Sequence, residues 1–355
     1  MNVDFSKKLL DWNKTDNLRT MPWKGEKDPY KIWLSEIILQ QTRVEQGWTY
    51  YENFIKAFPT VHHLAKAPRK KVFKLWEGLG YYNRCKNLIE TAKKISKNYK
   101  GKFPRDYQEI KSFKGIGPYT AAAIASFAFN LPFAVVDGNV ERVLSRYFGM
   151  STPTDTADGK RMFAELAGAL LDKKQPGIFN QAMMDFGAVI CKPKNPLCAQ
   201  CPQQKDCEAY IHQLLDVLPV KSKRIEKKKR WFYYFIIECK GSVYIHMRKQ
   251  KDIWQHLYEF VLYESDHALS PREMLNHPFA HNILGKSTIK GKNISLVYKQ
   301  QLTHQTIYAQ FIHVTVPRPL LTLKDFTLVK KKDIMQLPFP KSTATYIKQP
   351  LWTRK

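Results

Sequence analysis

The chain has 355 residues, more than one hydrophobic core usually organises, so two domains are expected. It carries 58 Lys and Arg against 31 Asp and Glu, and the formal charge of +27 favours nucleic acid as a partner over a generically basic soluble protein. Residues 1–11 lack the apolar core of a signal peptide, and no stretch approaches the roughly 18 apolar residues of a membrane span. We therefore expect a reducing, cytoplasmic compartment, in which six cysteines are more typical of metal ligands or free thiols than of disulfides.

The spacing of apolar residues changes once along the chain. From residue 30 to about residue 210 they recur at helical spacing in stretches broken by Pro and Gly, which predicts an all-helical region. Residues 221–230 then hold seven basic residues and one acid, which indicates a linker or a DNA-facing strap. Residues 231–238, 242–247 and 307–316 are β-rich, and Lys240-Gly241 predicts a hairpin turn. We predict a helical domain over residues 1–220, a basic linker over 221–230 and an α+β domain over 231–355.

The first candidate catalytic group is Glu36, which lies in the apolar run 32–39 on a predicted helix. Burial there should raise the pKa of its carboxyl group. An acid that stays protonated near neutral pH, together with a second acid that stays ionised, is what cleavage of a glycosidic bond through an oxocarbenium-like state requires. The alternative is a core carboxylate paired with a cation.

Residues 113–121 (FKGIGPYTA) predict a tight turn at Gly115 and Gly117, followed by a helix whose first amide groups can bind an anion. From the two glycines alone, an ordinary helix-turn-helix connection is equally consistent. Residues 136–140 (VDGNV) then place a carboxylate, Asp137, on a loop beside a glycine that lets another chain approach closely. Asp137 is the candidate ionised partner of Glu36.

Four of the six cysteines fall within seventeen residues, at the spacing C-x(6)-C-x(2)-C-x(5)-C. Four soft sulfur ligands on one loop suit a 4Fe-4S cluster or a zinc ion. The spacing leaves zinc open, although zinc sites usually pair two C-x(2)-C units and only one is present here. The candidate ligands are Cys191, Cys198, Cys201 and Cys207.

These motifs, in this order, resemble the MutY adenine DNA glycosylases. The resemblance is carried by residues 35–44 (SEIILQQTRV), residues 78–82 (GLGYY), the hairpin, Asp137 and the four cysteines, and it covers nearly the whole first domain. It implies an all-α helix-hairpin-helix glycosylase fold, in which a six-helix domain and an iron-sulfur cluster domain flank a DNA cleft. It places the hairpin at about residues 111–125 and selects 4Fe-4S over zinc for the loop 191–207.

The resemblance also implies roles for the catalytic residues. Glu36 would protonate N7 of a flipped adenine, and Asp137 would stabilise the sugar cation, while Tyr119 and Asn139 would orient the two acids. Flipping is needed because the glycosidic bond is unreachable inside the base stack.

Further residues match positions that contact DNA in the family. Trp23 and Gln181 match base-pocket positions, and Lys24 stands where the family often has Arg, so the bidentate contact of an arginine is lost there. Four other residues match positions that probe the duplex at the lesion, with the tyrosine as a wedge between bases: Gln41, Thr42, Leu79 and Tyr81. From the residues alone, ordinary packing of a helix face and a turn is the preferred explanation for these four.

The second domain resembles the Nudix-like recognition module of the same family, and residues 254–261 are similar to its core segment. The chain lacks the glutamate-rich metal motif of active Nudix hydrolases, so we expect no pyrophosphatase activity. Residues Leu302, Thr303 and His304 stand where the family usually carries Phe-Ser-His to sense 8-oxoguanine. Leu302 removes the stacking ring and leaves Thr303 and His304 to form hydrogen bonds.

The resemblance thus implies a monomeric, monofunctional, nucleoid-associated bacterial glycosylase that hydrolyses adenine from double-stranded DNA, opposite 8-oxoguanine or guanine, and leaves an abasic site. The nearest alternative is an endonuclease III-type glycosylase-lyase, which shares the fold but needs a lysine amine at the position of Tyr119. A catalytically silent DNA-binding module is a second alternative, but it gains nothing from pairing a buried Glu36 with Asp137.

Overall fold

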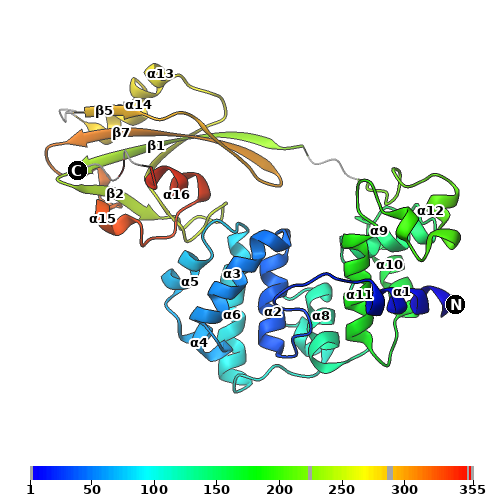
Figure 1. The fold of residues 1–355 in the computed structure, drawn as a ribbon. Helices are drawn as coiled ribbons and strands as arrows, with labels where there is room; N and C mark the ends of the chain where they lie inside the picture. Colours follow the sequence, from blue (N-terminus) through cyan, green and yellow to red (C-terminus); the bar gives the residue numbers. More distant parts are fainter. Residues whose placement is uncertain (1–2, 223–225, 286–290, 350–351, 353–355) are drawn as a thin grey trace. The chain divides into compact units, whose positions relative to one another are not determined.

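The computed structural model describes residues 3–222, 226–285, 291–349 and 352. The chain divides into two compact units, one formed by Met1–Ala67 and Lys86–Lys223 and the other by Pro68–Cys85 and Arg224–Lys355. The first unit is helical and the second is built on a mixed sheet, which confirms the predicted fold class (Figure 1). None of the helices in the described ranges has the length and apolar character needed to cross a membrane.

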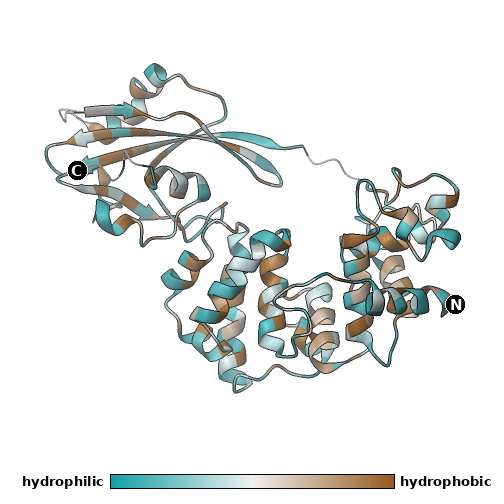
Figure 2. Ribbon diagram, in the orientation of Figure 1, coloured by the Kyte–Doolittle hydropathy of each residue, from teal (hydrophilic) through white to brown (hydrophobic). Residues whose placement is uncertain are grey.

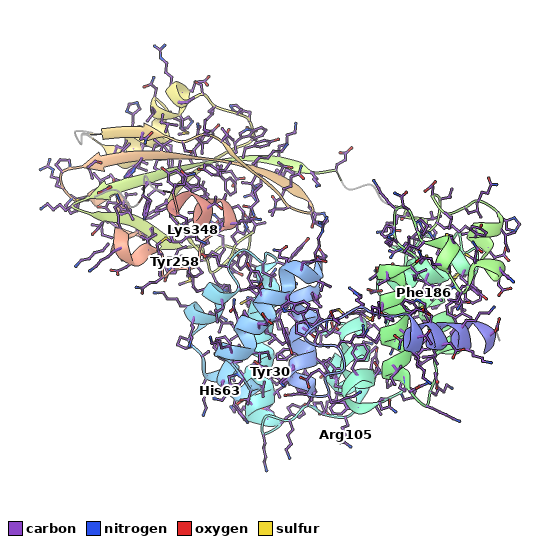
Figure 3. The ribbon with its side chains drawn as sticks, viewed as in Figure 1. Tyr30, His63, Arg105, Phe186, Tyr258 and Lys348 are labelled. Carbon is purple, nitrogen blue, oxygen red and sulfur yellow. The ribbon has the colours of Figure 1, made fainter. Side chains whose placement is uncertain are left out.

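The helices of the first unit bury their apolar sides against one another, and brown and teal residues alternate along them in Figure 2. One core cluster joins residues of α1, α9, α10 and α11, including Phe186, which lies inside the unit, whereas Arg105 projects from its surface (Figure 3). The helices are α1 (Val3–Thr15), α2 (Pro29–Leu39), α3 (Val44–Ala57), α4 (Val61–Lys66), most of α6 (Tyr82–Asn98), α7 (Tyr107–Lys111), α8 (Pro118–Phe129), α9 (Gly138–Tyr147), α10 (Ala157–Leu170), α11 (Pro176–Val189) and α12 (Glu208–Ile211), with 3-10 turns η1 (Cys198–Gln200) and η2 (Gln204–Asp206).

Helix α2 is central to the first unit and is buried around nearly its whole circumference. The Asp28 side chain caps its N-terminus by accepting a hydrogen bond of 2.9 Å from the Tyr30 amide, and Pro29 occupies the first helical turn, where no intrahelical donor is required. A helix that is apolar on all sides belongs in a core. The sequence therefore buries Glu36, which α2 carries among apolar neighbours, as predicted.

Two glycines allow close approaches that shape the site. Gly115, in the turn between α7 and α8, has a φ of +80°, and a Cβ there would meet Asn87 Cβ at 2.7 Å. Gly187 in α11 lies against the first turn of α9, where a Cβ would meet Asn139 Cβ at 2.7 Å. A side chain at either position would force the hairpin or the α9–α11 contact apart.

The sheet of the second unit has the strand order β3-β2-β1-β7-β5, with β4 on β1, β6 on β7 and β8 on β2. Its two long central strands run parallel, and the paired residues extend from Lys228 with Gln305 to Cys239 with Val316. The strands are β1 (Lys228–Cys239), β2 (Ser242–Met247), β3 (Tyr258–Glu259), β4 (Val261–Ser265), β5 (Gly291–Ile294), β6 (Tyr298–Gln301), β7 (Gln305–Val316) and β8 (Thr327–Lys330). The helices are α5 (Arg69–Leu75), α13 (Pro271–Leu275), α14 (Pro278–Leu284), α15 (Lys331–Ile334) and α16 (Lys341–Ile347), with the 3-10 turn η3 (Leu321–Leu323).

Strand β1 is buried on both faces, which explains its continuous apolar run. Tyr233 and Phe235 pack in a cluster with residues of α13 and α14, while Tyr234 stacks on Phe311, which in turn stacks on Tyr346 of α16. The predicted turn at Lys240-Gly241 is present, with positive φ at both residues. Strand β1 begins at Lys228, inside the segment 221–230 that was predicted as a linker, and residues 223–225 lie outside the described residues.

One segment from the first half of the chain belongs to the second unit. Residues Pro68–Cys85 group with the sheet, although the domain prediction placed them within residues 1–220. The Lys74 ammonium group donates to the Leu337 carbonyl at 3.0 Å, and the Phe339 amide donates to the Glu77 carboxylate at 2.8 Å. The predicted duplex-probing residues Leu79 and Tyr81 therefore share a unit with Thr303 and His304.

Candidate active site

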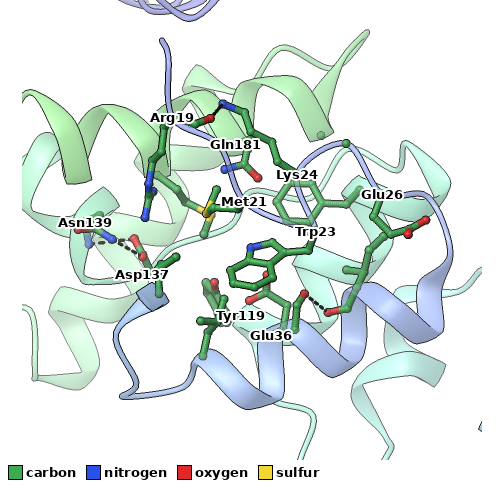
Figure 4. A pocket seen from close by; sticks show the side chains of 18 of the residues that line it. Arg19, Met21, Trp23, Lys24, Glu26, Glu36, Tyr119, Asp137, Asn139 and Gln181 are labelled. Atoms are coloured by element: carbon green, nitrogen blue, oxygen red, sulfur yellow. Dashed lines mark hydrogen bonds between the residues drawn. The ribbon is translucent and has the colours of Figure 1, made fainter. Parts of the chain in front are cut away.

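A cavity of about 540 Å³ in the first unit collects all four predicted catalytic residues and five of the predicted DNA-contact residues. Side chains from α2, α8, α9, α11 and the segments before and after α2 line it. In Figure 4, Glu36 and Tyr119 lie next to each other beneath the Trp23 ring, with Asp137 and Asn139 to one side. The predicted residues that line this cavity are Trp23, Lys24, Glu36, Gln41, Thr42, Tyr119, Asp137, Asn139 and Gln181.

Glu36 has the properties of an acid that is protonated near neutral pH. It is 5% exposed, and burial raises the pKa of its carboxyl group from 4.5 to about 7. A hydrogen bond with the Tyr119 hydroxyl lowers this pKa in part, and the nearby charge of Asp137 raises it further. Burial also raises the pKa of Tyr119 well above its usual value, so the phenol stays protonated and can serve as a hydrogen-bond donor.

Asp137 is held as a carboxylate at the N-terminus of α9. One of its oxygens accepts hydrogen bonds of 2.9 Å from the amides of Asn139 and Val140, and the other accepts one of 2.8 Å from the Asn139 side chain. These donors and the positive end of the helix dipole stabilise negative charge at this position. The cavity therefore holds a buried acid and a capped carboxylate on different helices.

Arg142 connects Asn139 to the loop that carries the cysteines, a role that the sequence analysis missed. Its guanidinium group donates to Asn139 Oδ1 at 2.9 Å, to the Gly187 carbonyl at 2.7 Å and to the Cys191 carbonyl at 2.7 Å. With its oxygen bound to Arg142, the Asn139 carboxamide must direct its nitrogen toward Asp137. The only sequence signal was a basic residue one helical turn after Asn139.

The four predicted cluster ligands are partly buried free thiols in the loop after α11: Cys191, Cys198, Cys201 and Cys207. Cys191, Cys201 and Cys207 pack against the core of the first unit. Burial is the main reason why the pKa of Cys201 rises to about 12. The charges of the other three cysteines also raise this pKa, because those thiols lie near Cys201. Arg146 Nη1 donates to Cys191 Sγ at 3.6 Å. No group of three or more His, Cys, Asp or Glu in the described ranges is arranged to hold a metal ion. The donor set, four soft sulfur ligands on one loop and none in a disulfide, fits an iron-sulfur cluster by its chemistry.

The base-pocket candidates lie on one wall of the cavity. Trp23 is buried and packs edge-to-face on Tyr51, with ring centroids 5.3 Å apart. Lys24 forms an ion pair of 2.9 Å with Asp185, a fully buried carboxylate on α11 that sequence reasoning missed. The Gln181 side chain donates to the same Asp185 at 2.9 Å. An acid four residues after Gln181 was the signal that could have found this contact, because positions i and i+4 share a helix face.

The remaining first-unit candidates lie in two turns. Gln41 and Thr42 follow the end of α2, with Gln41 in the left-handed region at a φ of +57°. Gly115 and Gly117 form the turn before α8, and Gly117 is its N-cap. The two glycines do not line the cavity, whereas Tyr119, two residues after Gly117, does.

The lesion-probing candidates of the second unit line a separate cavity of about 980 Å³. The hydroxyl groups of Tyr81 and Thr303 form a hydrogen bond, and the Arg84 guanidinium lies 5.3 Å from the centroid of the Tyr81 ring. Tyr81 is partly exposed and has a φ of +47°, a conformation that side chains with a Cβ rarely adopt. Leu79 and His304 line the same cavity. The structure thus brings the two predicted probing segments together.

Comparison with known families defines the class of the protein. Residues 34–166 match the HhH-GPD superfamily of base excision DNA repair proteins, and residues 233–349 match the NUDIX domain. The chain is also similar to a solved thermostable thymine-DNA glycosylase, with a TM-score of 0.55 and 33% identity, over 59% of this chain and 96% of that one. The class is therefore a helix-hairpin-helix base-excision repair protein with a Nudix-like C-terminal region.

Relatives that match along most of their length narrow this class to one family. The adenine DNA glycosylase of Buchnera aphidicola subsp. Baizongia pistaciae is 34% identical over 315 residues, which cover 88% of this chain and 86% of the relative. The adenine DNA glycosylase of Buchnera aphidicola subsp. Acyrthosiphon pisum is 33% identical over 337 residues, which cover 89% of this chain and 95% of the relative. The chain belongs to the adenine DNA glycosylase family, the MutY family that its motifs resemble, and it is a DNA glycosylase of base-excision repair.

Proposed function

We propose that the protein hydrolyses the N-glycosidic bond of adenine opposite 8-oxoguanine or guanine in double-stranded DNA and leaves an abasic site. The observation that carries this proposal is the pair of acids in one cavity, Glu36 with a pKa of about 7 and Asp137 as a capped carboxylate. An acid that is half protonated near pH 7 can deliver a proton and regain one within a catalytic cycle. The family membership supports adenine as the base.

The base must leave the duplex before it reaches this pair. Glu36 is 5% exposed and lies at the bottom of a cavity, beneath the Trp23 ring, so a base stacked in a helix cannot contact it. A flipped nucleotide would place its base against Trp23, and the contacts in the pocket would offset the cost of unstacking. The hairpin with Gly115 and Gly117 would hold the phosphate backbone through the amide groups at the start of α8.

Bond cleavage then follows from the two acids. Protonated Glu36 donates its proton to N7 of adenine, the bond between N9 and C1′ breaks, and its electron pair stays with the departing base. Positive charge develops on the deoxyribose, and the Asp137 carboxylate stabilises it. A water molecule adds to C1′ and gives up a proton to the Glu36 carboxylate, which leaves the abasic product and returns Glu36 to its protonated form. Tyr119 orients Glu36 through its hydroxyl group, and Asn139 orients Asp137 through its amide.

The same geometry supports a monofunctional enzyme over a lyase. A lyase needs an amine near C1′ to form a Schiff base, and the residue beside Glu36 is a tyrosine, whose phenol cannot form one. We therefore propose that the abasic strand remains intact after excision.

The cysteine loop would hold a 4Fe-4S cluster through Cys191, Cys198, Cys201 and Cys207. When bound, the cluster would supply a rigid cross-link within the loop. Arg142 links the cysteine loop to the acid pair, because it donates hydrogen bonds both to the Cys191 carbonyl and to Asn139. Proper packing of the loop would therefore help to orient Asp137.

Recognition of the opposite base would fall to the second unit. Tyr81 would insert beside the lesion, and Thr303 and His304 would hydrogen-bond its edge, with Leu302 contributing no stacking ring. Gln41, Thr42 and Leu79 would contact the disturbed base pair. We expect the enzyme to act on DNA as a monomer.

One assay tests this proposal. The protein would be incubated with duplexes that contain adenine opposite 8-oxoguanine, adenine opposite guanine, or thymine glycol, and the products would be heated with alkali. We expect alkali-labile sites at adenine in the first two duplexes and an intact strand without alkali. Cleavage at thymine glycol alone would identify an endonuclease III-type activity and overturn the proposal.

A further inference from the structure

Arg146, near the end of α9, is a buried cation that no carboxylate neutralises. It is 2% exposed, and none of the carboxylates in the described ranges forms an ion pair with it. Its guanidinium group instead donates to four backbone carbonyl oxygens, at 3.1, 2.8, 3.2 and 2.7 Å: those of Leu218, Lys192, Pro193 and Leu215. A buried charge that meets only neutral groups is costly, so an anion is expected beside it.

The buried arginines of the second unit show the usual arrangement. Arg230 pairs with Asp252 at 2.7 Å and with Glu264 at 2.6 Å. Arg248 pairs with Glu259 and, at 3.1 Å, with Asp252. Each of these guanidinium groups therefore has two carboxylates as partners, which offset the cost of burying its charge.

Sulfur atoms of the cysteine loop can supply the negative charge that Arg146 lacks. Arg146 Nη1 donates to Cys191 Sγ at 3.6 Å, and the Cys207 thiol donates to the Arg146 carbonyl at 3.5 Å. Arg146 thus contacts the first and the last of the four cysteines. Cysteines ligate an iron-sulfur cluster as thiolates, so the loop becomes anionic once it holds the cluster. Arg142 differs, because it contacts the Cys191 carbonyl and not the sulfur.

We propose that Arg146 supplies the buried positive charge that neutralises the ligated cysteine loop, and that it thereby retains the cluster and raises the reduction potential of the cluster. A positive charge beside a cluster stabilises the more reduced state, which is the more negative one, relative to the more oxidised state. The inference rests on the proposed 4Fe-4S cluster and adds to it the residue that tunes its potential. Arg146 is not a ligand and acts through its charge.

The test measures the potential at which an electrode removes one electron from the cluster of the purified protein. Arg146→Gln removes the charge, and we expect the potential to shift in the negative direction. Iron should also pass to a chelator about tenfold faster or more, as is typical when a group that supports a metal ligand is lost. Arg146→Lys keeps the charge and should keep a potential close to the wild-type value.

Lys8→Gln is the matched control. Lys8 is a partly exposed cation that contacts the same loop through Asp206 at 2.8 Å, and it also pairs with Asp4. These two acids and the solvent already neutralise its charge, so the substitution should leave the potential and the rate of iron loss unchanged.

Two results would overturn the inference. One is a wild-type potential in Arg146→Gln, even with faster iron loss, because a purely structural role alters retention without altering the potential. The other is an equal shift in Arg146→Lys, which would assign the effect to hydrogen-bond geometry and not to charge. If Arg146→Gln retains no cluster, Arg146→Lys decides: a wild-type iron content and potential support the inference, and loss of the cluster overturns it. Wild-type protein that contains no iron would instead refute the proposed cluster.

Discussion

Replacing Glu36 by Gln should abolish base excision and, at the same time, make the folded protein less sensitive to rising pH. The wild-type carboxyl group has a pKa of 4.5 when exposed and about 7 in the folded chain, because it is buried. Between these two values the folded state binds more protons than the unfolded state, so the unfolding free energy falls as pH rises. Glutamine keeps the shape of the side chain but does not titrate.

The size of the effect follows from the two pKa values. The full shift corresponds to roughly 3 kcal/mol of unfolding free energy, which is present below about pH 4.5 and lost as pH rises through about 7. Between about pH 5.5 and about pH 8.5 the wild type should lose roughly 2 kcal/mol from this group alone. Over the same range the unfolding free energy of the Glu36→Gln variant should rise by that amount relative to the unfolding free energy of the wild type.

Urea unfolding at several pH values, followed by tryptophan fluorescence, measures this difference. Glu165→Gln is the control, since Glu165 is an exposed residue of α10 in the same unit, and the same substitution there should follow the wild-type pH profile. Single-turnover excision by the wild type should be level at low pH and fall about tenfold per pH unit above about 7. Parallel pH profiles of unfolding for Glu36→Gln and the wild type, or excision that survives the substitution, would show that Glu36 is not the buried acid of the reaction.

Four further outcomes follow from the site. Asp137→Asn should slow excision by about a hundredfold or more with little change in DNA affinity, because the developing sugar cation loses its countercharge; equal rates would exclude that role. Tyr119→Lys should gain an adduct that borohydride traps, which the wild type lacks, as gel electrophoresis would show. The purified Arg142→Gln variant should contain less iron and excise adenine more slowly than the wild type. The Arg161→Gln variant, changed at an exposed position, should keep the wild-type iron content and rate, as iron assays and rate measurements would show. Thr303→Ala should lower the preference for 8-oxoguanine over guanine by about tenfold in paired excision assays, and an unchanged ratio would place recognition elsewhere.

Local patterns were sufficient to predict the features that depend on one segment of chain. The apolar run around Glu36 predicted a buried acid, because a helix that is apolar on all sides has no solvent-facing position to offer. The glycine pair predicted a tight turn, since Gly115 adopts a positive φ that few other residues tolerate, and only the family resemblance identified this turn as the hairpin. The cysteine spacing predicted a group of thiols on one loop, although spacing alone left zinc and iron-sulfur open, and only the family resemblance favoured the cluster.

The partners of the charged residues were decided by the tertiary structure alone. Arg19 and Asp185 are 166 positions apart, and nothing in either local sequence shows that they pair. A helical period reveals which face of a helix is apolar, but not which helix packs against it. For the same reason Arg142 looked like an ordinary basic residue of α9, and residues Pro68–Cys85 looked like part of the first domain until their place in the second unit was known. The sequence determined the chemistry of the acids and thiols, whereas long-range packing determined which groups hold them in place.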